Sequence, residues 1–165
     1  MEHRAGEEAI RAVLAALFWA GEDEARQQED LQELSRLAET AGYTVTGILT
    51  QQRGSPDART CLGEGKLREL REFVKANEAE LILFDNELTP SQIKNIEKAC
   101  DCRVFDYSML ILEIFHQHAL TREGRLQVEM AQLQYTLPRL TGRGIELSRL
   151  GGGGGAGGAG AVRFG

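Results

Sequence analysis

The class of fold is decided by Leu81-Ile-Leu-Phe-Asp-Asn-Glu-Leu-Thr-Pro-Ser-Gln92. Its first four residues form a short apolar run, which is typical of a buried strand. Thr89 follows with a side chain that can cap a helix, Pro90 suits the first helical position, and Gln92 can complete a capping box. A buried strand that leads at once into a capped helix predicts a crossover unit of an α/β protein.

The same alternation of strand and helix extends in both directions along the chain. Helices are expected where apolar residues recur three and four positions apart, and strands where apolar or β-branched residues run together. The expected strands are 11–19, 43–50, 81–84 and 103–105, with 58–62 as a candidate short strand. The expected helices are 24–41, 65–77, one that opens at Pro90, and 109–119, the last continuing into a long arm. This pattern predicts a small, mostly parallel sheet flanked by helices.

The arm carries a heptad seam of apolar residues. A seam of this kind requires a partner helix, and Pro138 is expected to kink or end the arm. Within this chain the seam can fold back on the α/β body or pair with a second copy in a weak antiparallel dimer. The seam residues recur at spacings of 4, 3, 4 and 3, and they are Leu126, Met130, Leu133, Leu137 and Leu140.

Three regions are expected along the chain. Residues 1–120 form an N-terminal α/β domain, residues 121–150 a helical arm, and residues 151–165 a glycine-rich loop or tail that has few side chains to bury. No second helix of matching length follows the arm in the sequence. We therefore expect the chain to be part of a larger protein that supplies the partner helix.

Charge is distributed unevenly between the body and the arm. Residues 1–120 hold 13 Lys/Arg and 22 Asp/Glu, a net charge of -9, whereas residues 121–165 hold 6 and 3, a net charge of +3. A basic arm on an acidic body indicates that the arm meets an anionic partner. Three cysteines, an odd number, argue against a secreted disulfide framework, and the apolar run near the start is too short to cross a bilayer. A cytoplasmic protein without membrane contact is expected.

Several segments carry a more specific signal, in order along residues 44–155. They are Leu62-Gly-Glu-Gly-Lys66, Leu83-Phe-Asp-Asn-Glu-Leu-Thr-Pro-Ser-Gln92, Asn95-Ile-Glu97, Leu110-Ile-Leu-Glu-Ile-Phe115, Thr121-Arg-Glu-Gly-Arg-Leu-Gln-Val-Glu129, Ala131-Gln-Leu133 and Leu137-Pro-Arg-Leu-Thr-Gly142. Together these segments resemble the HflX family of translational GTPases. The resemblance implies an N-terminal α/β subdomain, then an antiparallel helical hairpin of which the arm is the first helix, then a C-terminal GTP-binding domain that is missing here.

The resemblance also implies a function. Family members bind the large ribosomal subunit, so this chain would be the domain that docks on the subunit and its rRNA. GTP and magnesium are the cofactors implied for the whole protein, and none is expected in this fragment. A glycine-rich connection between the hairpin helices reaches towards the peptidyl-transferase region. Residues 147–153 resemble the start of that connection, whereas residues 156–165 lack the family's threonine-arginine-glycine-proline-glycine-glutamate pattern.

A P-loop is absent from the sequence. That loop requires Gly-x-x-x-x-Gly-Lys-Ser/Thr, because backbone amides wrap the phosphates and the hydroxyl holds magnesium. The only Gly-Lys pair is Gly65-Lys66, with Thr60 at the position of the first glycine and Leu67 at that of the hydroxyl. The parent protein resembles a GTPase, but this fragment is expected not to hydrolyse GTP.

A candidate nucleotide or anion site lies at the turn that contains Gly63, Gly65 and Lys66. Amides at a helix start, together with a lysine, can hold a phosphate, and the resemblance adds that some family members bind ATP through this region. The alternative is a tight turn in which the glycines permit unusual dihedral angles. Asp85 completes the candidate site, because it follows a strand where a parallel sheet forms its ligand crevice.

Asp85 and Asp106 have a second interpretation, as do the cysteines and histidines. Each aspartate can hold magnesium, and each can instead cap the helix that follows it. The sequence Cys100-Asp-Cys102 lies upstream of two histidines, but the usual zinc spacings are missing. We expect core cysteines, surface histidines and no metal site.

Arginines along the arm are the candidate contacts to RNA. The guanidinium group binds phosphate in a bidentate geometry, although a solvated helix face with local glutamate partners explains the same pattern. Two rival functions stay open: an independent ATP-binding domain that uses the glycine turn, and an oligomerisation module built on the seam. The candidate RNA contacts are Arg122, Arg125, Arg139, Arg143, Arg149 and Arg163.

Overall fold

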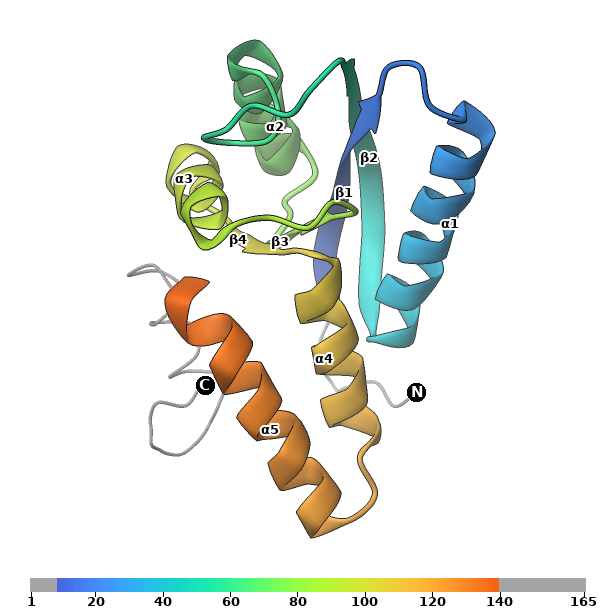
Figure 1. Ribbon diagram of the computed structural model, residues 1–165, viewed down its shortest axis with the longest axis vertical. Coiled ribbons are helices and arrows are strands. Elements are labelled where there is room, and N and C mark those ends of the chain that lie inside the picture. The colour runs from blue at the N-terminus through green and yellow to red at the C-terminus, as the bar shows by residue number, and fades with distance from the viewer. Residues whose placement is uncertain (1–8, 140–165) are drawn as a thin grey trace. The chain divides into compact units, whose positions relative to one another are not determined.

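The computed structural model describes residues 9–139. These residues fall into two compact units, one that ends at Ile114 and one that begins at Phe115. The strands and α-helices, labelled in Figure 1, are β1 (Ile10–Trp19), α1 (Glu24–Thr40), β2 (Tyr43–Arg53), α2 (Glu64–Ala76), β3 (Leu81–Phe84), α3 (Pro90–Cys100), β4 (Arg103–Phe105), α4 (Tyr107–His118) and α5 (Arg122–Thr136). The short 3₁₀ helix η1 (Leu137–Arg139) follows α5.

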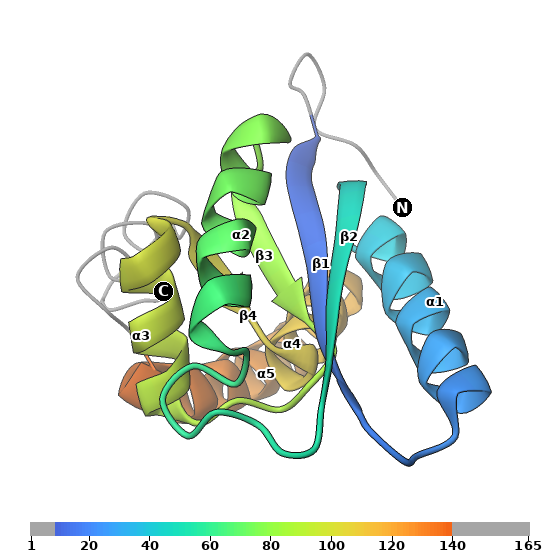
Figure 2. The same cartoon turned by 90° about the horizontal axis from the view of Figure 1, so that it is seen from above.

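All four strands belong to one parallel sheet with the order β2-β1-β3-β4. The chain moves from β1 to β2 in one direction and then back across β1 to β3 and β4. Because crossover connections are right-handed, this reversal puts α1 on one face of the sheet and both α2 and α3 on the other. Figure 2 shows these two layers. The α/β fold with a parallel sheet flanked by helices is therefore confirmed.

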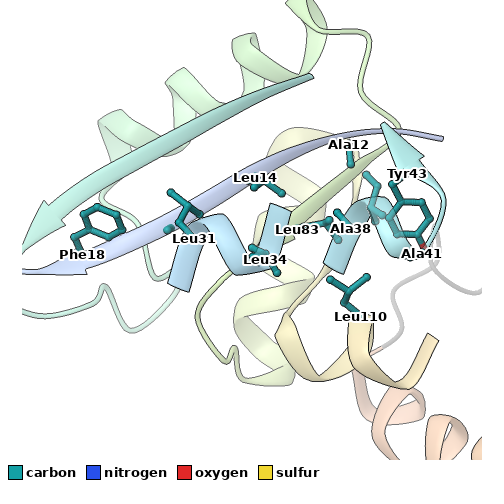
Figure 3. Packing of buried hydrophobic residues seen from close by; sticks show 12 residues of the cluster. Ala12, Leu14, Phe18, Leu31, Leu34, Ala38, Ala41, Tyr43, Leu83 and Leu110 are labelled. Carbon is teal, nitrogen blue, oxygen red and sulfur yellow. The ribbon is translucent and has the colours of Figure 1, made fainter. Parts of the chain in front are cut away.

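The main apolar cluster lies between the sheet and α1. Leu14 of the central strand, Leu34 of α1 and Leu110 in the first turn of α4 are fully buried there (Figure 3). Burial of one such leucine side chain stabilises the fold by about 1.5–3 kcal/mol. Strand β1 is buried over most of its length because it is covered on both faces, which explains its nearly continuous apolar sequence.

The start of α3 confirms the predicted capping box. The Thr89 hydroxyl accepts a hydrogen bond from the Gln92 N–H at 3.0 Å, and the Gln92 side-chain oxygen accepts one from the Thr89 N–H at 2.9 Å. Pro90 occupies the first turn, as expected. The helix therefore begins at a point that is fixed by local sequence alone.

The connection from β2 to α2 differs from the prediction. Strand β2 runs on to Arg53, and the candidate short strand at 58–62 is a turn. The Asp57 carboxylate accepts hydrogen bonds from the N–H groups of Arg59 (2.8 Å) and Thr60 (3.3 Å), which folds the backbone back on itself. Cys61 has a φ of 68°, in the left-handed region that is uncommon for residues other than glycine, and it closes the turn through an isolated β-bridge with Asp57.

The second unit begins within α4 and contains α5. The prediction of one continuous helix from residue 109 into the arm is wrong, because α4 ends at His118 and α5 begins at Arg122. The Thr121 hydroxyl accepts the Gly124 N–H at 2.9 Å and so caps a new helix. Helix α5 ends before Pro138, as predicted. Leu126, Met130 and Leu137 of the seam are 55%, 60% and 53% exposed.

Leu140, the last residue of the seam, lies outside the described residues, as does the glycine-rich region. Among residues 9–139, no helix combines the length and the apolar character that a membrane span requires.

Candidate functional site

The start of α2 holds the glycine turn of the candidate nucleotide site. Gly63 is the N-cap residue, and no side chain caps the helix. Its own N–H donates a hydrogen bond to the Gln51 side-chain oxygen at 2.8 Å. A Cβ atom at position 63 would lie 2.5 Å from Arg53 Nη1. A side chain at position 63 would therefore displace the Arg53 guanidinium, because this group lies directly against the start of α2.

Lys66 is already paired, and Gly65 has open space around it. The Lys66 ammonium forms an ion pair with Glu69 on the next turn, at 3.0 Å, so its charge is already partly neutralised. A Cβ atom at position 65 would meet nothing within 4 Å, so no close contact requires a glycine there. These features weaken the assignment of phosphate binding to Lys66.

Arg53 is the cation that lies against the start of α2, and sequence reasoning missed it. Its Nε donates to the Ser55 carbonyl oxygen at 2.9 Å, and it forms no ion pair with a described carboxylate. A basic residue at the carboxyl end of a parallel strand, just before a glycine turn, was the available signal. It was overlooked because β2 was expected to end three residues earlier.

Asp85 lies apart from the glycine turn. Burial, followed by the negative charge of Asp30 in α1, raises the pKa of its carboxyl from 3.8 to about 6. Its N–H donates to the Ala15 carbonyl oxygen at 3.0 Å. Asp30 belongs to the helix on the opposite face of the sheet from α2, and among the described residues no hydrogen bond or ion pair joins Asp85 to Gly63 or Lys66.

The helix-cap interpretation is wrong for Asp85 and confirmed for Asp106. Helix α3, which follows Asp85, is capped by Thr89. Asp106 is 1% exposed and accepts hydrogen bonds from the N–H groups of Met109 at 3.1 Å and Leu88 at 3.2 Å. Its carboxylate therefore fixes both the start of α4 and the loop that precedes α3.

Three of the six candidate RNA-contact arginines lie in the described region. Arg122 is exposed at the first turn of α5, and Arg125 donates to the Ala119 carbonyl oxygen at 3.5 Å. Arg139 lies over the Tyr135 ring at 3.7 Å and donates to the Tyr135 carbonyl oxygen at 2.7 Å, which holds it against its own chain. The candidates outside the described residues are Arg143, Arg149 and Arg163.

The cysteines are buried, and burial raises the pKa of Cys61 and of Cys100 to about 11, so both stay protonated at neutral pH. Protonated thiols are poor metal ligands. His116 contacts Glu129 of α5 at 3.0 Å. Across residues 9–139, no group of three or more His, Cys, Asp or Glu side chains is arranged to hold a metal ion.

The sequence of this chain is similar to those of known GTP-binding proteins. The sequence model described as GTP-binding GTPase N-terminal matches residues 28–116, and the one described as GTP-binding GTPase Middle Region matches residues 118–164. The chain belongs to the HflX family of GTP-binding proteins. Among similar HflX proteins, GTPase HflX of Caldanaerobacter subterraneus subsp. tengcongensis is 50% identical over 143 residues, which are 87% of this chain and 32% of that protein.

One further HflX relative and two solved structures are similar to this chain. GTPase HflX of Escherichia coli K12 is 42% identical over 143 residues, 87% of this chain and 33% of that protein. A crystal structure of SsGBP in complex with GDP is similar with a TM-score of 0.63 at 28% identity, covering 79% of this chain and 36% of that one. A GTP-binding protein from the archaeon Sulfolobus solfataricus, also with GDP, has a TM-score of 0.59 at 28% identity over 78% and 38%. The chain thus spans about a third of its HflX relatives' length.

Proposed function

We propose that this chain is the part of an HflX protein that docks on the large ribosomal subunit in the cytoplasm, through contacts with rRNA. The observation that carries the proposal is the charge of the arm, where residues 121–165 hold six arginines and three glutamates. All six arginines are candidate contacts, and the middle-region model of the family covers them. An arm that is basic while the body is acidic favours an anionic partner for the arm.

Arg122 and Arg125 are the clearest contacts in this proposal. Both side chains are exposed at the first turn of α5, and neither forms an ion pair with a described carboxylate. A guanidinium group can bind two phosphate oxygens at once, which positions a protein on RNA without reading its sequence. Arg139 contributes less until its contact with Tyr135 opens.

GTP and magnesium belong, in this proposal, to the GTP-binding domain of the whole protein. The sequence lacks the P-loop pattern that would hold the β- and γ-phosphates. We place the α/β domain at residues 1–120, the first hairpin helix at 121–150 and the glycine-rich connection at 151–165. The role of this chain is then docking and positioning, and the GTP-binding domain is its partner within the protein.

The experiment is binding of the chain to purified large subunits, measured by sedimentation for the wild type and for Arg122→Gln/Arg125→Gln. The proposal expects the double variant to bind more weakly. The matched control is Arg26→Gln/Arg36→Gln in α1, which removes the same charge from another element. Equal binding by the wild type and the arm variant would show that Arg122 and Arg125 do not contact the subunit.

A second candidate function is ATP binding at the start of α2, which Arg53 favours. The guanidinium of Arg53 lies beside uncapped helix amides, and both features attract a phosphate. Titration with ATP tests this candidate. A site of this kind should lose affinity in Arg53→Gln and less in Lys66→Ala, because Lys66 is already paired with Glu69. If both variants bind ATP as tightly as the wild type, this segment is a structural turn and not a phosphate site.

A further inference from the structure

The two helical layers of the α/β unit carry opposite charge. Residues 20–42, which contain α1, hold seven acidic and two basic residues, a net charge of -5. The opposite layer consists of residues 53–76 and 90–100, with α2 and α3, and it holds eight basic and five acidic residues, a net charge of +3. Figure 2 shows that the sheet separates these two layers. Over these two sets of residues, the α1 layer is therefore acidic and the α2–α3 layer is basic.

Three basic residues of the α2–α3 layer are neutralised locally. Lys66, Arg68 and Lys75 each form an ion pair with a glutamate three or four residues away on α2, at 3.0, 3.3 and 3.9 Å. The other five form no ion pair with any carboxylate among the described residues, although, after the hydrogen bond from the Arg59 N–H, the charges of Arg53 and Arg59 help to lower the pKa of Asp57. These five cations are Arg53, Arg59, Arg71, Lys94 and Lys98.

The loop that follows Arg53 and carries Arg59 is joined to α3 by two side-chain hydrogen bonds. The Asn95 side chain of α3 donates to the Arg59 carbonyl oxygen at 3.0 Å, and the Gln92 side chain donates to the Asp57 carbonyl oxygen at 3.1 Å. These bonds fasten the loop between β2 and α2 to α3, where Lys94 and Lys98 are exposed one turn apart. Two side chains at this spacing lie roughly 6 Å apart along the helix. In Figure 2 the loop passes below the start of α2 towards α3.

The surface of this layer has no large hydrophobic residue that is fully exposed, and Leu67 and Phe73 of α2 are half-buried. The large hydrophobic residues that are exposed in the described part of the chain all lie outside residues 53–76 and 90–100. A specific protein–protein interface normally has an apolar or aromatic centre. A surface of unpaired cations without such a centre is better suited to a phosphate backbone, which requires charge and hydrogen-bond donors.

We infer that the α2–α3 layer is a second RNA-binding surface, which contacts the phosphate backbone of rRNA through Arg53, Arg59, Arg71, Lys94 and Lys98. The inference rests on the proposed docking to the large ribosomal subunit, and it adds which side of the α/β unit meets the RNA. The α1 layer, with its net charge of -5, is repelled by phosphate and faces away.

The test compares binding of three proteins to purified large subunits at 50 and 200 mM monovalent salt. They are the wild type, Lys94→Gln/Lys98→Gln, and the control Arg26→Gln/Arg36→Gln, which loses the same charge from the α1 layer. All four replaced residues are exposed, so the changes should affect stability little. Equal melting temperatures of the three proteins would verify this.

The inference expects the α3 variant to bind more weakly at 50 mM salt and the control to bind nearly as tightly as the wild type, because the α1 layer faces away from the RNA. On a double-stranded backbone such as B-DNA, each phosphate contact makes the slope of log affinity against log salt steeper by about 0.9, and we apply this value to the helices of rRNA. The variant has lost two contacts, so its affinity falls less steeply with salt than that of the wild type. The ratio of the two affinities should therefore be about tenfold smaller at 200 mM than at 50 mM salt. Equal weakening of the control, or unchanged binding and slope in the α3 variant, would overturn the inference.

A second probe separates this inference from the proposed function. A single-stranded RNA homopolymer of about 30 nucleotides presents phosphates without a ribosome, with a salt slope of about 0.7 per contact. If the wild type binds the homopolymer and the α3 variant does not, the surface is confirmed even when large subunits fail to bind. If the wild type binds neither probe, both the surface and the docking proposal are refuted.

Discussion

Replacement of Asp85 by asparagine should stabilise the protein at neutral pH. Burial and the charge of Asp30 raise the pKa of the Asp85 carboxyl from 3.8 to about 6. A group whose pKa is higher in the folded state stabilises the fold below its unfolded pKa, and that contribution is lost as the pH rises through the folded pKa. At pH 7 Asp85 is therefore ionised and unfavourable, whereas asparagine has the same shape and no charge.

The magnitude follows from the size of the shift. One pKa unit corresponds to about 1.4 kcal/mol, so the shift of about two units sets an upper limit of about 3 kcal/mol. The carboxyl is partly exposed, and solvent reduces this value. We expect Asp85→Asn to raise the free energy of unfolding at pH 7 by about 1–2 kcal/mol. At pH 4, where the aspartate is protonated in the folded state, the gain should nearly vanish.

The assay is urea denaturation of both proteins at pH 4 and pH 7, followed by fluorescence of Trp19, the only tryptophan, at the end of β1. Asp57→Asn is the control of opposite sign, because hydrogen bonds from the Arg59 and Thr60 N–H groups lower the pKa of Asp57. That variant should be less stable than the wild type at pH 7. A destabilised Asp85→Asn at pH 7, or a gain that is equal at both pH values, would refute the reasoning.

Three further predictions concern the second unit and catalysis. Thr121→Ala removes the hydroxyl that caps α5, so it should lower the free energy of unfolding of that helix by about 1 kcal/mol, visible as a loss of helical circular dichroism, whereas Thr121→Ser should retain the cap. The exposed seam should let this 165-residue chain form a weak dimer, and Leu133→Glu should abolish the dimer in sedimentation experiments. A wild type that is monomeric at high concentration, or a dimer that the glutamate does not change, would exclude the seam as a dimer interface. Purified chain should show no GTP hydrolysis above buffer, because it lacks a P-loop, and stoichiometric magnesium-dependent turnover would contradict that assignment.

Local signals account for what the sequence predicted well. The capping box of Thr89 and Gln92 is complete within four residues, and strand β3 is a run of four apolar residues, so both were found at their observed positions. The break between α4 and α5 was also encoded locally, by Thr121 as N-cap. It was missed because the apolar pattern on either side of the break was interpreted as one continuous helix.

The candidate site depends on contacts that the sequence does not reveal. Asp85 acquires its raised pKa from burial and from Asp30, which is far away along the chain. Arg53 reaches the start of α2 only because β2 continues past its predicted end and the turn at Asp57 reverses the chain. The charge difference between the two layers becomes visible only when the crossover connections place α1 opposite α2 and α3.

The most direct test of the account is sedimentation of the wild-type chain with purified large and small ribosomal subunits across a series of salt concentrations. The account predicts saturable binding to the large subunit at 50 mM salt, with log affinity falling linearly against log salt as phosphate contacts are lost. It also predicts much weaker binding to the small subunit. Absence of binding to the large subunit at 50 mM salt, or equal binding to both subunits, would contradict the central claim that this chain is a docking domain for the large subunit.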